Sequence, residues 1–209
     1  MPAETDLLSA HSLHLWRGER HVLRGVSFAI GAGEALHVTG PNGVGKTSLL
    51  RVVCGLLQPE EGEVLWDGAS TSDANSEYLE ALAYLAHDTA LKGDLTASEN
   101  LHFSVGLKRT VSPEQIAAIL VELGVADCAD LPCRVLSAGQ RRRVALGRVL
   151  LSAARLWVLD EPFTNLDDAS TAQISDTLAR HLADGGLALI AAHQGLTLRS
   201  GNVKRLELS

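Results

Sequence analysis

The sequence contains few cysteines, and none lies in a ligand or redox motif. Cys54, Cys128 and Cys133 form no CxxC pair and no Cys/His group with metal-ligand spacing. Their odd number favours reduced, structural thiols in a cytosol-like compartment. A CxxCH haem-attachment motif is also missing.

Long apolar runs are missing as well. No stretch approaches the roughly 18 apolar residues that a transmembrane helix needs, because Arg51 interrupts one apolar run and His193 ends another. The N-terminal residues MPAETDLLSAH are acidic and lack the charged-then-apolar pattern of a signal peptide. We therefore expect no direct insertion into a membrane, so any membrane role must come through a partner.

An excess of positive charge is the third absence. Lys and Arg number 18 against 25 Asp and Glu, which gives a net charge of −7. Nucleic-acid-binding proteins normally have a basic balance or a basic face, so we expect no nucleic-acid partner. The one dense basic run is Arg141 to Arg143, which we expect to form a solvated helix face with contacts to local acidic residues.

What remains is the composition of one globular domain. The chain has 209 residues, of which 46% are hydrophobic and 21% charged, and it can bury a substantial core. Apolar segments between glycine-rich turns predict strands in the first part, and the helical spacing after Lys46 predicts a helix that stops near Gly55. The expected strands lie at 12–16, 21–30, 33–40, 62–68 and the end of 79–87.

Helical signals dominate from about residue 88. Thr96 with Glu99 forms a capping-box pattern, and Ser112-Pro113 opens a second helix that Gly124 follows. Strand signals return at 155–160, and a helix and another strand follow. Such alternation predicts an α/β fold with a parallel sheet covered on both faces. We expect one domain over 1–209, with a core of about 1–87 and 146–209 and a mostly helical insertion of about 88–145.

The segment GPNGVGKT fits the pattern GxxxxGK[ST] of a phosphate-binding P-loop between a strand and a helix. Its glycines let backbone N–H groups turn inward around the β-phosphate. Lys46 reaches the β- and γ-phosphate oxygens, and the Thr47 hydroxyl coordinates Mg²⁺. The predicted nucleotide-binding residues are Gly40, Pro41, Asn42, Gly43, Val44, Gly45, Lys46, Thr47 and Ser48.

The segment LWVLDEP supplies an acidic pair at the end of an apolar strand. Asp160 comes at the carboxyl end, where α/β folds bind their ligands, and is expected to hold Mg²⁺. Glu161 follows directly and can orient or deprotonate the attacking water. Alone, such a strand end is weak evidence, but together with the P-loop it predicts nucleotide hydrolysis.

LSAGQ, residues 136–140, predicts a helix start that favours an anion, without saying which chain presents that anion. A serine-capped helix without a ligand is the other interpretation of these residues alone. The segment resembles the signature of the ATP-binding cassette (ABC) ATPases, and this resemblance covers essentially the whole chain, with its motifs in the right order.

The resemblance implies ATP and Mg²⁺ as ligands. It also implies a P-loop NTPase (RecA-like) core with an N-terminal antiparallel β subdomain and an inserted helical subdomain. Cassettes of this family pair head to tail, so a second copy of the chain is the expected partner. In that pair, Ser137, Gly139 and Gln140 of one copy would bind the γ-phosphate held by Lys46 of the other.

Other positions match the family one at a time. His193 fits the switch histidine that contacts the γ-phosphate, and Asp167 fits a residue at the dimer seam. Trp16 stands where the family has an aromatic residue that stacks on adenine. From the residues alone, a structural histidine at a strand end and a half-buried strand tryptophan are alternative interpretations.

One position departs from the family pattern. The strand before the helical insertion usually ends in a glutamine that touches Mg²⁺ and the attacking water, whereas this chain has His87. A neutral imidazole can still coordinate or hydrogen-bond. Its protonation in mildly acidic solution would make ATP turnover sensitive to pH.

Several segments together are similar to the ATP-binding subunits of bacterial cytochrome c maturation systems: GEVLWDG, ENLHF, LSAGQRRRVALGR, LWVLDEPFTNLD and AAHQG. The histidine at position 87 agrees with that subgroup. This implies a peripheral subunit on the cytoplasmic face of the bacterial inner membrane, paired with polytopic membrane subunits. Its ATP hydrolysis would drive haem export or the release of a haem-loaded chaperone. Because the sequence continues for only a few residues after His193, we expect no regulatory C-terminal domain.

Two alternatives stay open at this point. One is the ATPase subunit of an ABC transporter for a different solute. The other is a soluble ABC ATPase that assembles iron–sulfur clusters or acts on nucleic acid, although the acidic charge and the lack of a coiled-coil or zinc insertion oppose a DNA-repair role. An NKxD base-reading motif is missing, which disfavours a P-loop GTPase.

Overall fold

The computed structural model describes residues 7–72, 76–106, 108–192 and 202–209. An antiparallel sheet of four strands in the order β2-β1-β4-β5 forms its first layer. The paired strands are β1 (Leu8–Arg17), β2 (Arg20–Ile30), β4 (Glu61–Trp66) and β5 (Ala69–Ser70). This is the antiparallel subdomain that the family resemblance implied.

A parallel sheet in the order β6-β7-β8-β3-β9 forms the central layer. Every residue of β7 and β8 is buried, which is why these segments are continuous apolar runs rather than alternating ones. The five strands are β3 (Glu34–Thr39), β6 (Leu82–Leu85), β7 (Leu156–Asp160), β8 (Leu187–Ala191) and β9 (Asn202–Glu207).

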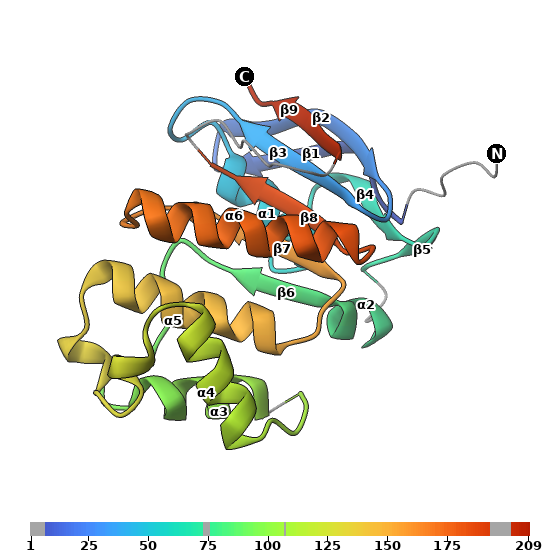
Figure 1. Cartoon of the computed structure of the whole chain (residues 1–209). Coiled ribbons are helices and arrows are strands. Elements are labelled where there is room, and N and C mark those ends of the chain that lie inside the picture. The colour runs from blue at the N-terminus through green and yellow to red at the C-terminus, as the bar shows by residue number, and fades with distance from the viewer. Residues whose placement is uncertain (1–6, 73–75, 107, 193–201) are drawn as a thin grey trace.

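Helices cover both faces of the parallel sheet, as the alternation of strands and helices predicted (Figure 1). Val158 and Leu189 pack in one core cluster with α1 (Lys46–Val53) and the antiparallel sheet. Leu159 and Ile190, the next residues of the same strands, pack in the other cluster with α6 (Asp168–Ala183). A short helix, α2 (Ser76–Ala81), precedes β6.

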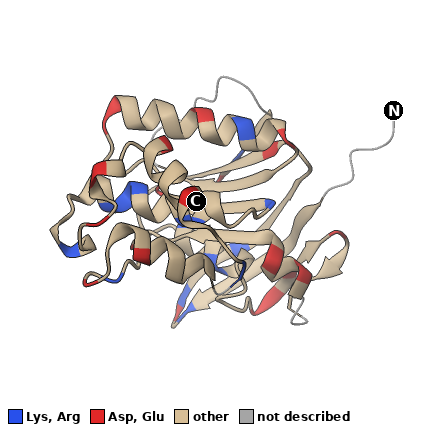
Figure 2. Ribbon diagram, turned by 60° about the horizontal axis from the view of Figure 1, so that its bottom comes forward, with Lys and Arg blue, Asp and Glu red and all other residues tan. Residues whose placement is uncertain are grey.

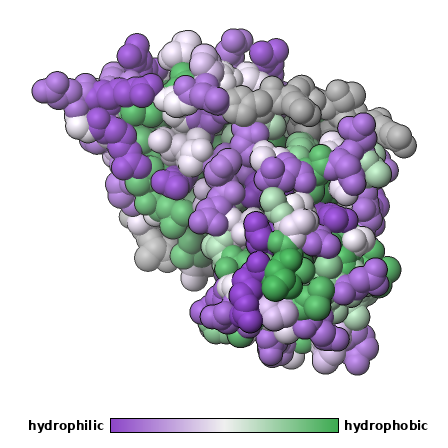
Figure 3. All heavy atoms as spheres, turned by 90° about the vertical axis from the view of Figure 1, so that its left-hand side faces the viewer, coloured by the Kyte–Doolittle hydropathy of each residue, from purple (hydrophilic) through white to green (hydrophobic). Residues whose placement is uncertain are grey.

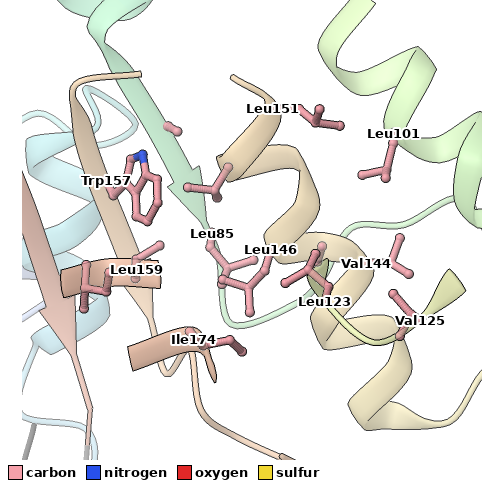
Figure 4. Close-up of a cluster of buried hydrophobic side chains, with 14 of the residues drawn as sticks. Leu85, Leu101, Leu123, Val125, Val144, Leu146, Leu151, Trp157, Leu159 and Ile174 are labelled. Carbon is pink, nitrogen blue, oxygen red and sulfur yellow. The ribbon is translucent and has the colours of Figure 1, made fainter. Parts of the chain in front are cut away.

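The segment between β6 and β7 is helical. It contains α3 (Ala97–Gly106), α4 (Pro113–Glu122), α5 (Ala138–Leu151) and the 3₁₀ turns Ala126–Cys128 and Cys133–Val135. In Figure 1, α5 lies between the parallel sheet and the α3–α4 pair. Figure 4 shows how side chains of α5, such as Leu146, join those of the sheet and of the other helices in one core cluster.

Reciprocal caps fix where these helices begin. Glu99 donates its backbone N–H to the Thr96 hydroxyl, and the Thr96 N–H donates to the Glu99 carboxylate, so the predicted capping box is confirmed. Ser112 and Gln115 form the same pair at α4, with Pro113 as the first helical residue. These local signals therefore fix the first turns of α3 and α4.

The expectation of a solvated face over Arg141–Arg143 is wrong. Arg142 is only 3% exposed, and Arg141 and Arg143 are half-buried. The guanidinium groups donate to backbone carbonyls: Arg141 to Leu136, and Arg143 to Leu123 and Gly124. The expectation failed because α5 is surrounded by the sheet on one side and by α3 and α4 on the other, which the sequence pattern of α5 did not reveal.

Cys54, Cys128 and Cys133 are all buried and free, as expected of structural thiols. Burial, with a smaller effect from the nearby Asp160 carboxylate, raises the pKa of Cys54 to about 12, so this thiol stays neutral. None of the helices in the described parts of the chain is both long and apolar enough to cross a membrane.

The edge strand β9 was not predicted from the sequence. It pairs in parallel with β3, and its residues are half-buried or exposed. Because several of them are charged, the segment lacks the apolar pattern by which a strand is predicted. The buried carboxylate of Glu34 binds two residues of β9: Asn202 donates to Oε1 at 2.8 Å, and the Lys204 ammonium lies 2.6 Å from Oε2. Burial by itself raises the pKa of Glu34, but the hydrogen bonds from Lys204, Gly31 and Asn202 and the charge of Lys204 lower it overall.

Glu34→Gln is expected to destabilise the protein by about 1–2 kcal/mol at pH 7, because a charge-assisted bond to β9 is lost while the amide stays buried. The folded-state pKa of Glu34 lies below that of the unfolded chain, about 4.3. Its stabilisation is therefore complete above that pH and is lost as the pH falls through the folded pKa. Urea denaturation of both proteins at a series of pH values measures the difference.

Glu207→Gln is the matched control, because Glu207 is an exposed carboxylate of the same strand that faces the equally exposed Arg205. It should change the unfolding free energy little at any pH. Equal effects of the two substitutions at pH 7, or a Glu34 effect that does not shrink in acid, would contradict the role given to Glu34.

Candidate functional site

A cavity of about 490 Å³ opens where the P-loop meets the carboxyl ends of β6 and β7. This is the edge of a parallel sheet at which α/β folds bind ligands. The cavity brings together residues that are distant in the sequence and that the motifs had singled out. These are Asn42, Gly43, Gly45, Lys46, Thr47, Ser48, His87, Asp160 and Glu161.

The P-loop has a backbone that only glycine fits at two points. Gly40 has φ +138°, and a Cβ there would lie 2.5 Å from the carbonyl oxygen of Leu208. Gly45 has φ +125°, and its Cβ would lie 2.7 Å from a methyl group of Val22. As the N-cap of α1, Gly45 also supplies no side chain to the first N–H groups of the helix, and no acidic residue occupies the first turn. The N-terminus of α1 is thus suited to bind an anion.

Lys46 is buried, and its ammonium is held over the loop. It donates to the carbonyl oxygens of Gly40 at 2.8 Å and Pro41 at 3.1 Å. An ammonium group has three protons, so one donor remains for a phosphate oxygen.

Asp160 ends β7 and is only 2% exposed. Its Oδ2 is buried and has no hydrogen-bond partner among the residues that the structure describes. Leaving a carboxylate oxygen buried without a donor is costly unless a cation satisfies it. Thr47 lines the same cavity, and a carboxylate, a hydroxyl and phosphate oxygens are the ligands that Mg²⁺ prefers. The residues present therefore fit a Mg²⁺ ion.

Glu161 follows in a conformation that is unusual for its residue type. Its φ is +52°, a left-handed conformation that costs about 1–2 kcal/mol for a residue other than glycine. The backbone is held on both sides: the N–H donates to Ala191 at 2.8 Å, and the carbonyl accepts from Arg142 at 2.8 Å. The turn directs the chain away from β7 at the cavity wall.

His87 lies two residues beyond β6 and lines the cavity, in the position to which the family pattern assigned it. It is exposed, and it shares the wall with Asp160 and Glu161. Whether its imidazole contacts the metal or water stays a prediction.

Three further lining residues were missed: Arg17, Arg20 and Val22. Arg20 is exposed and donates to the carbonyl oxygen of Gly43 at 2.7 Å, which adds a positive charge beside the P-loop. The sequence WRGER, residues 16–20, contains both arginines and a glycine typical of a turn. Only the tight β1–β2 hairpin, in which Arg17 pairs with Arg20, places them beside the P-loop.

Trp16 is not among the lining residues of this cavity. Its indole stacks on His21, with ring centroids 3.9 Å apart and planes 7° apart, and its backbone N–H donates to Glu60. Adenine stacking by Trp16 stays a prediction. His193 lies outside the described residues.

The residues of the signature segment lie outside the nucleotide cavity of their own chain. Ser137 is exposed and caps α5 in a reciprocal pair with Gln140. A Cβ at Gly139 would lie 2.5 Å from the carbonyl oxygen of Asn165, so the start of α5 packs closely on the segment after Glu161. Asp167 in that segment caps α6, and hydrogen bonds from Ser170 keep the pKa of Asp167 below its ordinary value.

Comparison with known proteins shows which family this chain is similar to. The sequence profile of the ABC transporter family matches residues 23–164. A protein of Nitrosomonas europaea named cytochrome c biogenesis ATP-binding export protein CcmA is 43% identical over 209 residues, which cover 100% of this chain and 98% of that protein. The protein of the same name from Cupriavidus pinatubonensis is 46% identical over 189 residues, 90% of this chain and 84% of its own length.

Solved structures agree at the level of the fold. A putative ABC transporter ATP-binding protein from Pyrococcus furiosus superposes with a TM-score of 0.83 at 25% identity, covering 96% of both chains. The α/β fold with an antiparallel and a parallel sheet is thus confirmed.

Gly45→Ala is expected to weaken ATP binding at least tenfold, about 1.4 kcal/mol, because the methyl group would displace Val22 or distort the loop at φ +125°. Equilibrium titration with a fluorescent ATP analogue measures this.

The matched control is Gly55→Ala, another glycine with positive φ (+70°), where a Cβ meets nothing within 4 Å. It should cost about 1 kcal/mol of stability, because a Cβ is disfavoured at positive φ, and leave ATP affinity unchanged. Wild-type affinity in the Gly45 variant would contradict the steric argument.

Proposed function

The chain belongs to the ABC transporter family, and we propose that it is the ATP-hydrolysing subunit of a transporter complex that acts in cytochrome c biogenesis and is coupled to haem export. Family membership gives nucleotide binding and ATP hydrolysis. One observation carries the site assignment: a single cavity joins the P-loop to the carboxylates of Asp160 and Glu161.

In the proposed reaction, the P-loop N–H groups and Lys46 bind the β- and γ-phosphates, and Thr47 and Asp160 hold Mg²⁺. Bound Mg²⁺ would neutralise charge on the phosphate oxygens. Glu161 accepts a hydrogen bond from the attacking water, orients it toward the γ-phosphorus and takes its proton as the new bond to phosphorus forms, with His87 and His193 as further contacts. As the bond to the β-phosphate breaks, Lys46 and the N–H groups stabilise the charge that develops on ADP.

The second copy of the chain completes the site in this proposal. Ser137 and Asp167 are exposed and lie away from their own nucleotide cavity, so both are accessible to a partner. Ser137, Gly139 and Gln140 would bind the γ-phosphate held by the other copy, with Asp167 at the seam. Hydrolysis removes that bridge, and the two copies separate as rigid bodies.

Subunits of this family work with membrane subunits in transporter complexes, and a peripheral position fits a chain whose described helices do not span a membrane. We place the chain on the cytoplasmic face of the bacterial inner membrane, beside polytopic subunits. Figure 3 shows apolar surface on the helical segment. Four large apolar side chains of this segment, Phe103, Val121, Leu131 and Val135, are 44–65% exposed. Lys and Arg are spread over several elements among Asp and Glu (Figure 2), in keeping with a protein rather than a nucleic-acid partner.

The relatives at 43% and 46% identity support the choice of pathway, because their names describe cytochrome c biogenesis and export. In this proposal the ATPase cycle drives haem export or the release of a haem-loaded chaperone, and haem need not contact this chain.

Glu161→Gln is expected to retain ATP affinity but to lower turnover at least about 100-fold, because the amide cannot accept the proton of the attacking water. The stalled protein should form a dimer in ATP and Mg²⁺ but not in ADP, as measured by light scattering. Glu80→Gln, an exposed carboxylate outside the cavity, is the matched control and should behave as wild type.

In the native host, Glu161→Gln should abolish haem-stained c-type cytochromes. Intact cytochromes together with loss of iron–sulfur enzyme activity would replace the proposed role with cluster assembly. A monomer in ATP would contradict the composite site.

Mixing two inactive variants tests whether each site is shared between copies. Ser137→Arg and Lys46→Ala should each lack ATPase activity alone. A mixed dimer contains one site with an intact Lys46 and an intact Ser137, so activity should return to about a quarter of wild type in a 1:1 mixture. No recovery, together with loss of ATP binding in Ser137→Arg, would mean that Ser137 acts within its own chain.

A further inference from the structure

Arg142 connects the start of α5 to the two loops that carry the catalytic side chains. Its Nη1 donates to the carbonyl oxygens of Ala86 at 2.7 Å and His87 at 3.2 Å. Its Nη2 donates to the carbonyl oxygens of Asp160 and, at 2.8 Å, Glu161. One buried guanidinium thus contacts four carbonyl groups from two separate loops.

These carbonyls belong to segments whose geometry the reaction needs. Glu161 adopts its left-handed φ of +52°, and such a conformation persists only where neighbouring contacts enforce it. β8 holds the N–H of Glu161 through Ala191, and Arg142 holds the carbonyl on the other side. The same guanidinium also donates to the backbone carbonyl of His87, which lines the same cavity as Glu161.

The shape of the side chain matters as much as its charge. A guanidinium is a planar fork with five N–H donors, whereas an ammonium on a flexible chain has three donors, fewer than the four carbonyl groups that Arg142 contacts. Burial lowers the pKa of Arg142, and the nearby carboxylates of Asp160 and Glu161 oppose that effect. The neighbouring Arg143 is a natural comparison, because it donates to two carbonyls, those of Leu123 and Gly124, away from the cavity.

We propose that Arg142 is a positioning residue that holds the backbone of Glu161 and His87 of its own chain in the orientation required for ATP hydrolysis. The role rests on the proposed ATPase function. Arg142 does not contact the nucleotide cavity, so it acts through the two residues that do.

The first test compares Arg142→Gln, Arg142→Lys and the control Arg143→Gln in the assembled complex. Arg142→Gln should lower kcat at least about tenfold and leave the KM for ATP within about twofold, because the P-loop is untouched. Arg142→Lys should recover part of the loss. Arg143→Gln should keep the wild-type kcat.

The second test places the substitution on one side of the shared site. In the mixture of Ser137→Arg and Lys46→Ala chains, the Ser137→Arg chain supplies the active Lys46 and Glu161. Adding Arg142→Gln to that chain should lower the recovered activity at least about tenfold. Adding it to the Lys46→Ala chain should change the activity less than about twofold, whereas a general effect on the stability of α5 would act equally from either chain.

The outcomes separate the two proposals. Wild-type kcat in a folded Arg142→Gln or Arg142→Lys protein, or equal loss from either chain of the mixture, would overturn the role of Arg142. If Arg142→Gln does not fold, the kcat of Arg142→Lys decides. Absence of ATPase activity in the wild-type complex would instead reject the proposed function itself.

Discussion

The burial of Asp160 is the constraint on which the site depends. An acidic side chain that is 2% exposed ends a strand in which every residue is buried, and its Oδ2 has no donor among the described residues. Such a group is costly in a folded protein unless a cation offsets its charge. In the proposed site, a preorganised metal ligand would offset that cost, because the carboxylate needs no further ordering when nucleotide binds. Thr47 and Lys46 line the same cavity from the P-loop.

Around this strand end, α5 has an unusual double role. Its core face packs against β6, α3 and α4, which joins the helical segment to the parallel sheet. Its first turns carry the signature residues at the surface and, one turn on, the buried Arg142 beneath the cavity wall. In the proposed dimer, α5 would connect the seam to the acidic pair of its own chain, because the helix contacts both regions.

Local signals made most of the fold predictable from the sequence. The P-loop, the capping box at Thr96, the helix start at Ser112-Pro113 and the apolar strands depend on neighbours within a few residues, so the sequence alone was enough to predict them. Arg142 and β9 were missed for the opposite reason, because their partners lie far along the chain. In the sequence, a buried charged run or a charged edge strand has the same pattern as a solvent-exposed segment. Arg17 and Arg20 line the cavity because the β1–β2 hairpin lies beside the P-loop, and no sequence motif predicts the position of that hairpin.

Ser137 illustrates how a structural and a functional interpretation can both hold. Its Oγ accepts the N–H of Gln140, and its own N–H donates to the Gln140 side chain, which is the bonding of an ordinary helix cap. Because the oxygen acts as acceptor in that cap, the hydroxyl proton remains available as a donor. The N–H groups of Ala138 and Gly139, the first two residues of α5, likewise have no acceptor within the helix. Capping therefore leaves these donors available for the anion binding proposed between two copies, and the two roles do not use the same atoms.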